Sequence, residues 1–190
     1  MMKGEECFKQ NKSTLKNVSY DDKNKVYMTE STIPVYDFDG IKDWYWDNII
    51  KSRIKGPKGP SNDALYIDGD RIVFIEFKNG NISLFGKDGL AHKLHDSLLM
   101  LLDEELAVSV VCKSFKPTTT YTRKHMEYIL VYNKNKYPNE GNNRRSIADS
   151  LNKRIRFGLE IYEGFLFAKV RTYTAEEFEK YFVSVIDNKL

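Results

Sequence analysis

The stretch "SNDALYIDGDRIVFIEFKNG", residues 61–80, decides how this chain folds. Two runs rich in β-branched and aromatic residues flank Asp68-Gly69-Asp70, a pattern typical of a β-hairpin. The second run is apolar, yet it ends with an acid and a base, Glu76 and Lys78. Because side chains two residues apart on a strand share one face, the sequence predicts that Phe74, Glu76 and Lys78 lie on the same side of the hairpin.

The hairpin also brings a second acid to this face. If the turn holds two residues, either Asp68-Gly69 or Gly69-Asp70, Asp63 shares the face of Glu76, whereas a three-residue turn would place it on the opposite face. We therefore expect two carboxylates and the Lys78 ammonium to converge at the open end of the hairpin. The alternative is a structural salt bridge between Glu76 and Lys78, or charges that are simply solvated.

This combination of charges suits one kind of chemistry. Two neighbouring carboxylates repel each other unless a cation lies between them. Mg²⁺ accepts one or two carboxylates together with water and phosphate oxygens. A carboxylate pair beside a lysine is therefore suited to phosphodiester hydrolysis: the metal polarises the phosphate and acidifies a water, and the lysine orients the nucleophile or offsets developing charge.

The rest of the sequence predicts an α/β fold. A loop rich in Pro and Gly, 55–60, precedes the hairpin. Periodic apolar residues predict helices and strands on both sides of it, and this mixed order implies a mixed central sheet with flanking helices. We expect helices over 39–52, 87–107, 144–155 and 174–186, and strands over 126–133 and 164–173, with 156–162 as the candidate partner of the last strand.

Three polar residues are the predicted starts of helices. Asp39 is the expected N-cap of the helix over 39–52, and Asp88 that of the helix over 87–107. Thr174 with an acid three residues later has the pattern of a capping box.

Length and composition indicate one soluble domain. A chain of 190 residues is long enough for one hydrophobic core, and 41% hydrophobic with 30% charged residues is ordinary for a soluble globular protein. Cys7 and Cys112 form neither a disulfide framework nor a metal-binding pattern. The longest apolar run, within 98–102, is too short to span a bilayer. We expect a cytoplasmic protein with no membrane partner, and secretion by a non-classical route is the alternative. Residues 1–32 are expected to form a loosely structured arm, and residues 33–190 a single domain.

Asp63, Glu76 and Lys78, on two strands joined by a turn and followed by a helix, resemble the motif of the PD-(D/E)XK nuclease superfamily. The resemblance covers roughly residues 40–133 and implies a restriction endonuclease-like core, in which the first Asp and the E-x-K group lie on neighbouring strands of a mixed sheet. It further implies a metal-dependent nuclease that acts on DNA. Asp63, Glu76 and the Phe77 carbonyl would bind Mg²⁺ or Mn²⁺, and Lys78 would be the catalytic lysine.

The helix before the hairpin departs from the family pattern. Many members carry a Glu there, whereas this helix offers Asp43, Asp47 and Asn48. Of these, Asp47 or Asn48 would support the site. The missing Glu favours an alternative function, a catalytically decayed nuclease-fold module that binds nucleic acid or a protein partner, including an immunity or inhibitor role. The intact set of two acids and one lysine favours the enzyme.

Basic residues near the motif are candidates for binding nucleic acid. Lys55 and Lys58 precede Asp63 and would contact a phosphate backbone at the mouth of the site. Lys93 flanks the apolar stripe of the following helix and would contact a phosphate there. The alternative for all three lysines is plain solvation. The net charge of +3 is compatible with nucleic acid but does not identify it.

Overall fold

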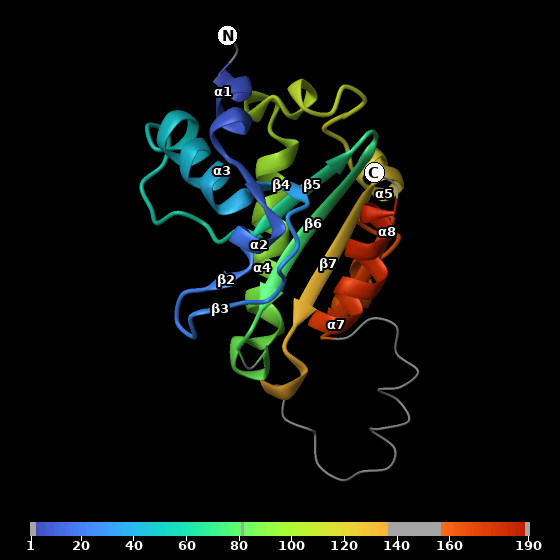
Figure 1. Cartoon of the computed structure of the whole chain (residues 1–190). Coiled ribbons are helices and arrows are strands. Elements are labelled where there is room, and N and C mark those ends of the chain that lie inside the picture. Colours follow the sequence, from blue (N-terminus) through green and yellow to red (C-terminus); the bar gives the residue numbers. More distant parts are fainter. Residues whose placement is uncertain (1–2, 81, 137–156, 189–190) are drawn as a thin grey trace.

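A mixed six-stranded sheet organises the chain (Figure 1). The structure, a computed structural model, describes residues 3–80, 82–136 and 157–188. The strand order is β1-β4-β5-β6-β7-β8. Pairing is antiparallel from β1 to β6 and parallel from β6 to β8. The predicted α/β class with a mixed central sheet is confirmed.

The elements follow one another along the chain as strands and helices of varied length. The strands of the main sheet are β1 (Lys12–Thr14), β4 (Pro34–Asp37), β5 (Ala64–Asp68), β6 (Arg71–Lys78), β7 (Met126–Tyr132) and β8 (Lys169–Thr174), and a small second sheet pairs β2 (Tyr20–Asp21) with β3 (Val26–Tyr27). The α-helices are α1 (Lys3–Gln10), α2 (Leu15–Val18), α3 (Phe38–Tyr45), α4 (Ile82–Leu102), α5 (Thr119–His125), α7 (Ala175–Phe178) and α8 (Ser184–Asp187). Shorter turns are the π-helical η1 (Trp46–Ile50) and η6 (Glu179–Val183) and the 3₁₀-helical η2 (Glu104–Leu106), η3 (Val108–Val110), η4 (Lys134–Lys136) and η5 (Leu159–Tyr162).

The predicted hairpin is formed by β5 and β6. Asp68 pairs with Arg71, so the turn holds two residues, Gly69 and Asp70. Gly69 has a φ of +58°, the left-handed conformation that a tight hairpin turn needs and that glycine adopts without strain. Ala64 pairs with Ile75, and the same register places Asp63 opposite Glu76.

The two faces of β6 bury side chains in two separate layers of core. Ile72 and Phe74 pack with side chains of α1, α3 and α4, whereas Val73, Ile75 and Phe77 pack with side chains of α7, η6 and α8. Figure 1 shows the same arrangement for these elements, with α7 and α8 beside β7 and with α3 and α4 on the other side of the hairpin. Glu76 and Lys78 follow Phe74 on the first face, as the alternation predicted.

The helix before the hairpin begins earlier than predicted. Its N-cap is Asp37, whose side chain accepts a hydrogen bond of 3.1 Å from the Gly40 N–H, so the prediction of Asp39 as N-cap is wrong. Two aspartates, Asp37 and Asp39, precede the apolar stripe, and both are suitable N-cap residues. A sequence pattern locates a helix more reliably than it locates the first residue of the helix. Asp39 is therefore inside the first turn and free for other contacts.

The helix after the hairpin, α4, spans Ile82–Leu102 and is also displaced from its predicted bounds of 87–107. Asp88 lies inside α4, so its predicted role as N-cap is wrong. The predicted apolar stripe is buried at four positions, Leu90, Leu94, Leu98 and Leu101. This stripe holds α4 against the sheet face that carries Glu76.

The C-terminal part combines one confirmed and one wrong prediction. The capping box between Thr174 and Glu177 is present at the start of α7. The strand over 164–173 is shorter than predicted and pairs in parallel with β7, and within its predicted partner over 156–162 the residues Leu159–Tyr162 form η5 instead of a strand. Alternation along a strand indicates its faces but not its partner, which explains the error. The helix predicted over 144–155 lies outside the described residues.

The N-terminal residues are integrated into the fold, so the expected loose arm over 1–32 is wrong where the structure describes it. β1 pairs with β4, and Cys7, Phe8 and Leu15 are buried. These few apolar residues are irregularly spaced among polar ones, which is why the sequence resembles a loose arm. Among the helices that the structure describes, none has the length and apolar character needed to cross a membrane.

Phe8→Ala should test this integration. Phe8 is 1% exposed and packs edge-on against Tyr36, so its loss should lower the free energy of unfolding by about 3–5 kcal/mol. Lys9→Ala, an exposed position on the same helix, should change it by less than about 0.5 kcal/mol. Urea denaturation of both variants measures these changes. An equally small effect for Phe8→Ala would show that the N-terminal residues form a loose arm after all.

Candidate functional site

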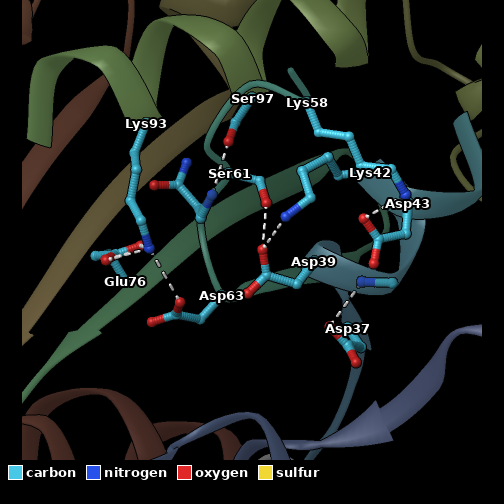
Figure 2. A network of polar contacts seen from close by, with 12 residues as sticks. Asp37, Asp39, Lys42, Asp43, Lys58, Ser61, Asp63, Glu76, Lys93 and Ser97 are labelled. Carbon is cyan, nitrogen blue, oxygen red and sulfur yellow. Dashed lines mark hydrogen bonds and ion pairs between the residues drawn. The ribbon is translucent and has the colours of Figure 1, made fainter. Parts of the chain in front are cut away.

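Four charged side chains meet at the end of β6 and form what we call the acid–lysine cluster: Asp63, Glu76, Lys78 and Lys93. Figure 2 shows three of them, Asp63, Glu76 and Lys93. Glu76 is fully buried. Its carboxylate lies 2.7 Å from Lys78 Nζ and 2.8 Å from Lys93 Nζ. Lys93 Nζ is also 3.4 Å from Asp63 Oδ1. The Lys93 ammonium therefore lies between the two carboxylates.

The length of β5 explains how Asp63 enters the cluster. β5 begins at Ala64, so Asp63 lies just beyond the last backbone pair with β6. Asp63 Oδ2 accepts a hydrogen bond of 2.6 Å from the Phe77 N–H, in place of a strand carbonyl. In an antiparallel ladder the N–H and C=O of one residue face the same neighbour. The Phe77 carbonyl thus faces the side of β6 on which Asp63 lies, as the resemblance implies.

Burial and the nearby charge of Glu76 control the charge of Asp63. Burial, reinforced by the charge of Glu76, raises the pKa of Asp63 from 3.8 to about 7, although Lys93 and Lys78 act in the opposite direction. Burial alone would lower the pKa of Lys93, but the charges of Glu76 and Asp63 outweigh it and raise that pKa. Lys93 consequently stays an ammonium ion and supplies the cation that the carboxylate pair requires.

Helix α3 brings a third acid close to the cluster, which the sequence reasoning missed. Asp39 accepts hydrogen bonds from the Ser61 hydroxyl and from Lys42 Nζ, the latter at 2.9 Å. Figure 2 shows its carboxylate with these two donors. Its charge also helps to raise the pKa of Lys93. Asp39 lies two residues before Ile41, the first residue of the predicted apolar stripe, and its predicted role as N-cap left its contact with Ser61 unconsidered.

The two residues expected to support the site have their contacts elsewhere. Asp47 lies 3.7 Å from Lys51 Nζ and 3.5 Å from Lys58 Nζ, and Asn48 donates a hydrogen bond of 2.8 Å to the Trp44 carbonyl. Both side chains are exposed. The prediction that Asp47 or Asn48 supports the cluster is therefore wrong, because η1 presents these positions to solvent.

The two lysines of the preceding loop differ in their surroundings. Lys55 is exposed, within a stretch that forms no regular structure. Lys58 Nζ is 3.1 Å from Asp43 Oδ1 and 3.5 Å from Asp47 Oδ2. The charge of Lys58 is thus shared with two acids, whereas Lys55 forms no ion pair with any residue that the structure describes.

Buried polar atoms beside the cluster have no hydrogen-bond partner among the described residues. They are both side-chain polar atoms of Asn62, next to Asp63 in the chain, and the Tyr128 hydroxyl. Burial, together with the charges of Glu76 and Asp63, raises the pKa of Tyr128. Buried polar groups in native proteins are nearly always paired with protein, water or ligand. These orphaned atoms point to water or a ligand at the cluster.

The donors of the cluster fit a hard divalent cation. Two carboxylates and one backbone carbonyl are oxygen ligands, and Mg²⁺ completes such a set with water and phosphate oxygens. Within the described part of the chain, no group of three His, Cys, Asp or Glu side chains is placed to hold a metal ion. An ion between Asp63 and Glu76 would also replace Lys93 in that position, so the lysine side chain would have to move.

No protein-family model, curated protein or solved structure matches this chain. The resemblance to the PD-(D/E)XK superfamily therefore rests on the motif residues and on the geometry of the cluster.

The raised pKa of Asp63 gives a pH-dependent prediction for Asp63→Asn. Because the folded pKa of about 7 exceeds the unfolded value of 3.8, folding favours the protonated acid, and the parent protein loses stability as the pH rises between these values. Asn carries no such charge. In EDTA, the free energy of unfolding of the variant relative to that of the parent should therefore rise by on the order of 1–4 kcal/mol from pH 4 to pH 8.

Urea denaturation of both proteins at the two pH values measures this difference. Asp68→Asn, at the exposed end of β5, is the control and should follow the parent. A pH-independent difference for Asp63→Asn would show that the buried acid is charged throughout.

Proposed function

We propose that this chain is a divalent-metal-dependent nuclease that hydrolyses phosphodiester bonds, with a restriction endonuclease-like core of the PD-(D/E)XK kind. One observation carries the proposal. Asp63 lies across the hairpin from Glu76 and accepts a hydrogen bond from the backbone of Phe77, with Lys78 next on the same face. This is the arrangement of acids and lysine on neighbouring strands that the resemblance implies.

The proposal gives each member of the cluster a role. Asp63, Glu76 and the Phe77 carbonyl would hold Mg²⁺ or Mn²⁺, and the ion would supply Lewis-acid activation of the phosphate and of a water molecule. Lys78 is 13% exposed and close to Glu76, so it can reach a phosphate and offset the charge that develops on it. Lys93 compensates the carboxylates when no ion is bound and is available to a phosphate oxygen when one is.

Nucleic acid is the proposed partner, and DNA is favoured because of the family resemblance. The exposed Lys55 is placed in the loop that leads to Asp63, where a phosphate backbone would pass. A cytoplasmic location belongs to the same proposal, since that is where an intracellular nucleic acid would be met.

A second function is favoured by the charge balance of the cluster. When both acids are ionised, two carboxylates face two ammonium groups, and the cluster is then neutral without a metal ion. A catalytically decayed module would keep this network as a structural salt bridge and bind nucleic acid or a protein partner without cutting it, as an immunity or inhibitor protein would.

Cleavage assays separate the two functions. The parent protein should cut single- or double-stranded DNA or RNA with Mn²⁺ and fail to do so in EDTA. Glu76→Gln should reduce cleavage by at least about a hundredfold, because it removes a proposed metal ligand. Glu104→Gln, an exposed position in η2, should cut like the parent. Absence of cleavage by a folded parent on all substrates with Mn²⁺ would support the decayed module.

Binding of nucleic acid is tested through its salt dependence. If Lys55 contacts a phosphate, Lys55→Ala in the Glu76→Gln background should lower the slope of log affinity against log salt by about 0.9 on duplex DNA, since one fewer counterion is released. Lys58→Ala should change it less, because Lys58 is paired with two acids. Fluorescence anisotropy at several salt concentrations gives the slopes. Equal slopes for Glu76→Gln and for its combinations with Lys55→Ala and Lys58→Ala would show that Lys55 is solvated and contacts no phosphate.

A further inference from the structure

A second polar site lies at the opposite end of the sheet. A cavity of about 500 Å³ opens where β6, β7 and β8 begin. We call it the strand-start pocket, and the side chains that matter for its chemistry are Arg71, Glu127, Lys169, Arg171, Tyr173 and Tyr181. Its strand residues have odd numbers, like Ile75 and Ile129, so they belong to the face covered by the C-terminal helices. The acid–lysine cluster is on the other face, at the other end of β6.

The parallel register of the strands assembles the charged groups of this pocket. Glu127 pairs with Lys169 across β7 and β8, and Arg171 follows two residues later on the same face. Arg71, the first residue of β6, reaches Glu127 through two hydrogen bonds of 2.9 and 3.2 Å, one to each carboxylate oxygen. Glu127 is thereby committed to Arg71. Arg171 Nε is 3.7 Å from the same carboxylate, beyond hydrogen-bond distance.

The pocket has an excess of positive charge. Arg71, Lys169 and Arg171 contribute three positive charges and Glu127 one negative charge, which leaves a net charge of +2. A phosphate monoester carries between one and a half and two negative charges at pH 7, so it matches this excess better than a carboxylate does. Arginine also offers a planar fork of donors that suits phosphate oxygens.

Aromatic rings form the remaining wall. The rings of Tyr173 and Tyr181 have centroids 6.0 Å apart and are tilted by 34°. Tyr181 is 52% exposed, so part of its ring is open to a ligand. Lys180 Nζ lies 5.0 Å from the centroid of that ring and adds a cation at the rim. The volume is within the range of small-molecule sites, about 300–1,000 Å³.

We propose that the strand-start pocket binds a phosphate monoester that carries a flat ring, the chemistry of a mononucleotide. The phosphate would be held by Arg171 and Lys169, and the ring would lie against Tyr181. The pocket shares no residue with the acid–lysine cluster, so this proposal stands or falls independently of the nuclease function.

Calorimetric titration in EDTA tests the pocket without contribution from a metal site. The probes are adenosine 5′-monophosphate, adenosine and inorganic phosphate. The monophosphate should bind saturably with a Kd below about 1 mM, and adenosine and inorganic phosphate should each bind at least about tenfold more weakly, since each offers half of the contacts. Absence of saturable binding by the monophosphate would overturn the proposal.

Two variants locate the binding. Arg171→Gln should weaken monophosphate binding by about tenfold or more, the loss expected for a charge-assisted hydrogen bond. Arg53→Gln is the matched control, because Arg53 pairs with Glu105 outside the pocket, and its Kd should equal that of the parent. Tyr181→Ala should weaken the monophosphate and leave inorganic phosphate unchanged. An unchanged Kd in a folded Arg171→Gln protein would place the bound nucleotide elsewhere and contradict the assignment.

Discussion

The buried pair of Asp63 and Glu76 needs a cation between its carboxylates, and much of the structure around the hairpin is arranged to provide one. Two like charges at this separation in a poorly solvated place would be strongly unfavourable. Lys93 from α4, shown in Figure 2, and Lys78 from β6 supply the positive charge. Removing a lysine from such a buried network costs about 3–5 kcal/mol, because the carboxylates are left uncompensated.

This requirement connects the cluster to the fold. β5 has to stop at Ala64 so that the Asp63 side chain, and not a backbone carbonyl, takes the Phe77 N–H. Helix α4 has to lie against the same face, which its buried leucines ensure. The Asn62 N–H donates a hydrogen bond of 2.8 Å to Ser97 Oγ on α4 and fixes the loop before β5 to that helix. The positions of strand, loop and helix are therefore mutually dependent.

A site of this kind can exchange one cation for another. Lys93 is tethered by a flexible chain and remains charged, so it can leave the carboxylates when a divalent ion arrives and return when the ion departs. Such an exchange reconciles a charge-balanced cluster with a metal-dependent reaction. It also distinguishes the nuclease from the decayed module, in which Lys93 would stay bound to the two carboxylates and no metal ion would replace it.

The hairpin and its site were largely predictable from the sequence because local rules determine them. A two-residue turn and strict alternation place Asp63 with Glu76, and no distant part of the chain is needed to infer this. Lys93 was identified as a neighbour of the site, but its place between two acids depends on the packing of α4. Asp39 was missed because its role depends on how α3 is oriented over the loop at Ser61.

Other parts depend on long-range contacts that sequence pattern does not encode. The parallel pairing of β8 with β7 involves a connection of many residues, and alternation within β8 would suit any neighbour. The N-terminal residues owe their order to β4 and to the core layer beneath α3, and their own composition gives little indication of this. Tertiary contacts thus determine the structure of the segments whose local propensity is weak.

The exchange of Lys93 for a metal ion is the central claim, and Mn²⁺ binding measured by electron paramagnetic resonance tests it most directly. The parent protein should bind Mn²⁺ saturably. Lys93→Met, which removes the competing ammonium while keeping most of the length of the side chain, should bind it more tightly, because the carboxylates then lose the ammonium that lies between them. Saturable binding in neither protein would contradict the account and leave the cluster as a structural salt bridge.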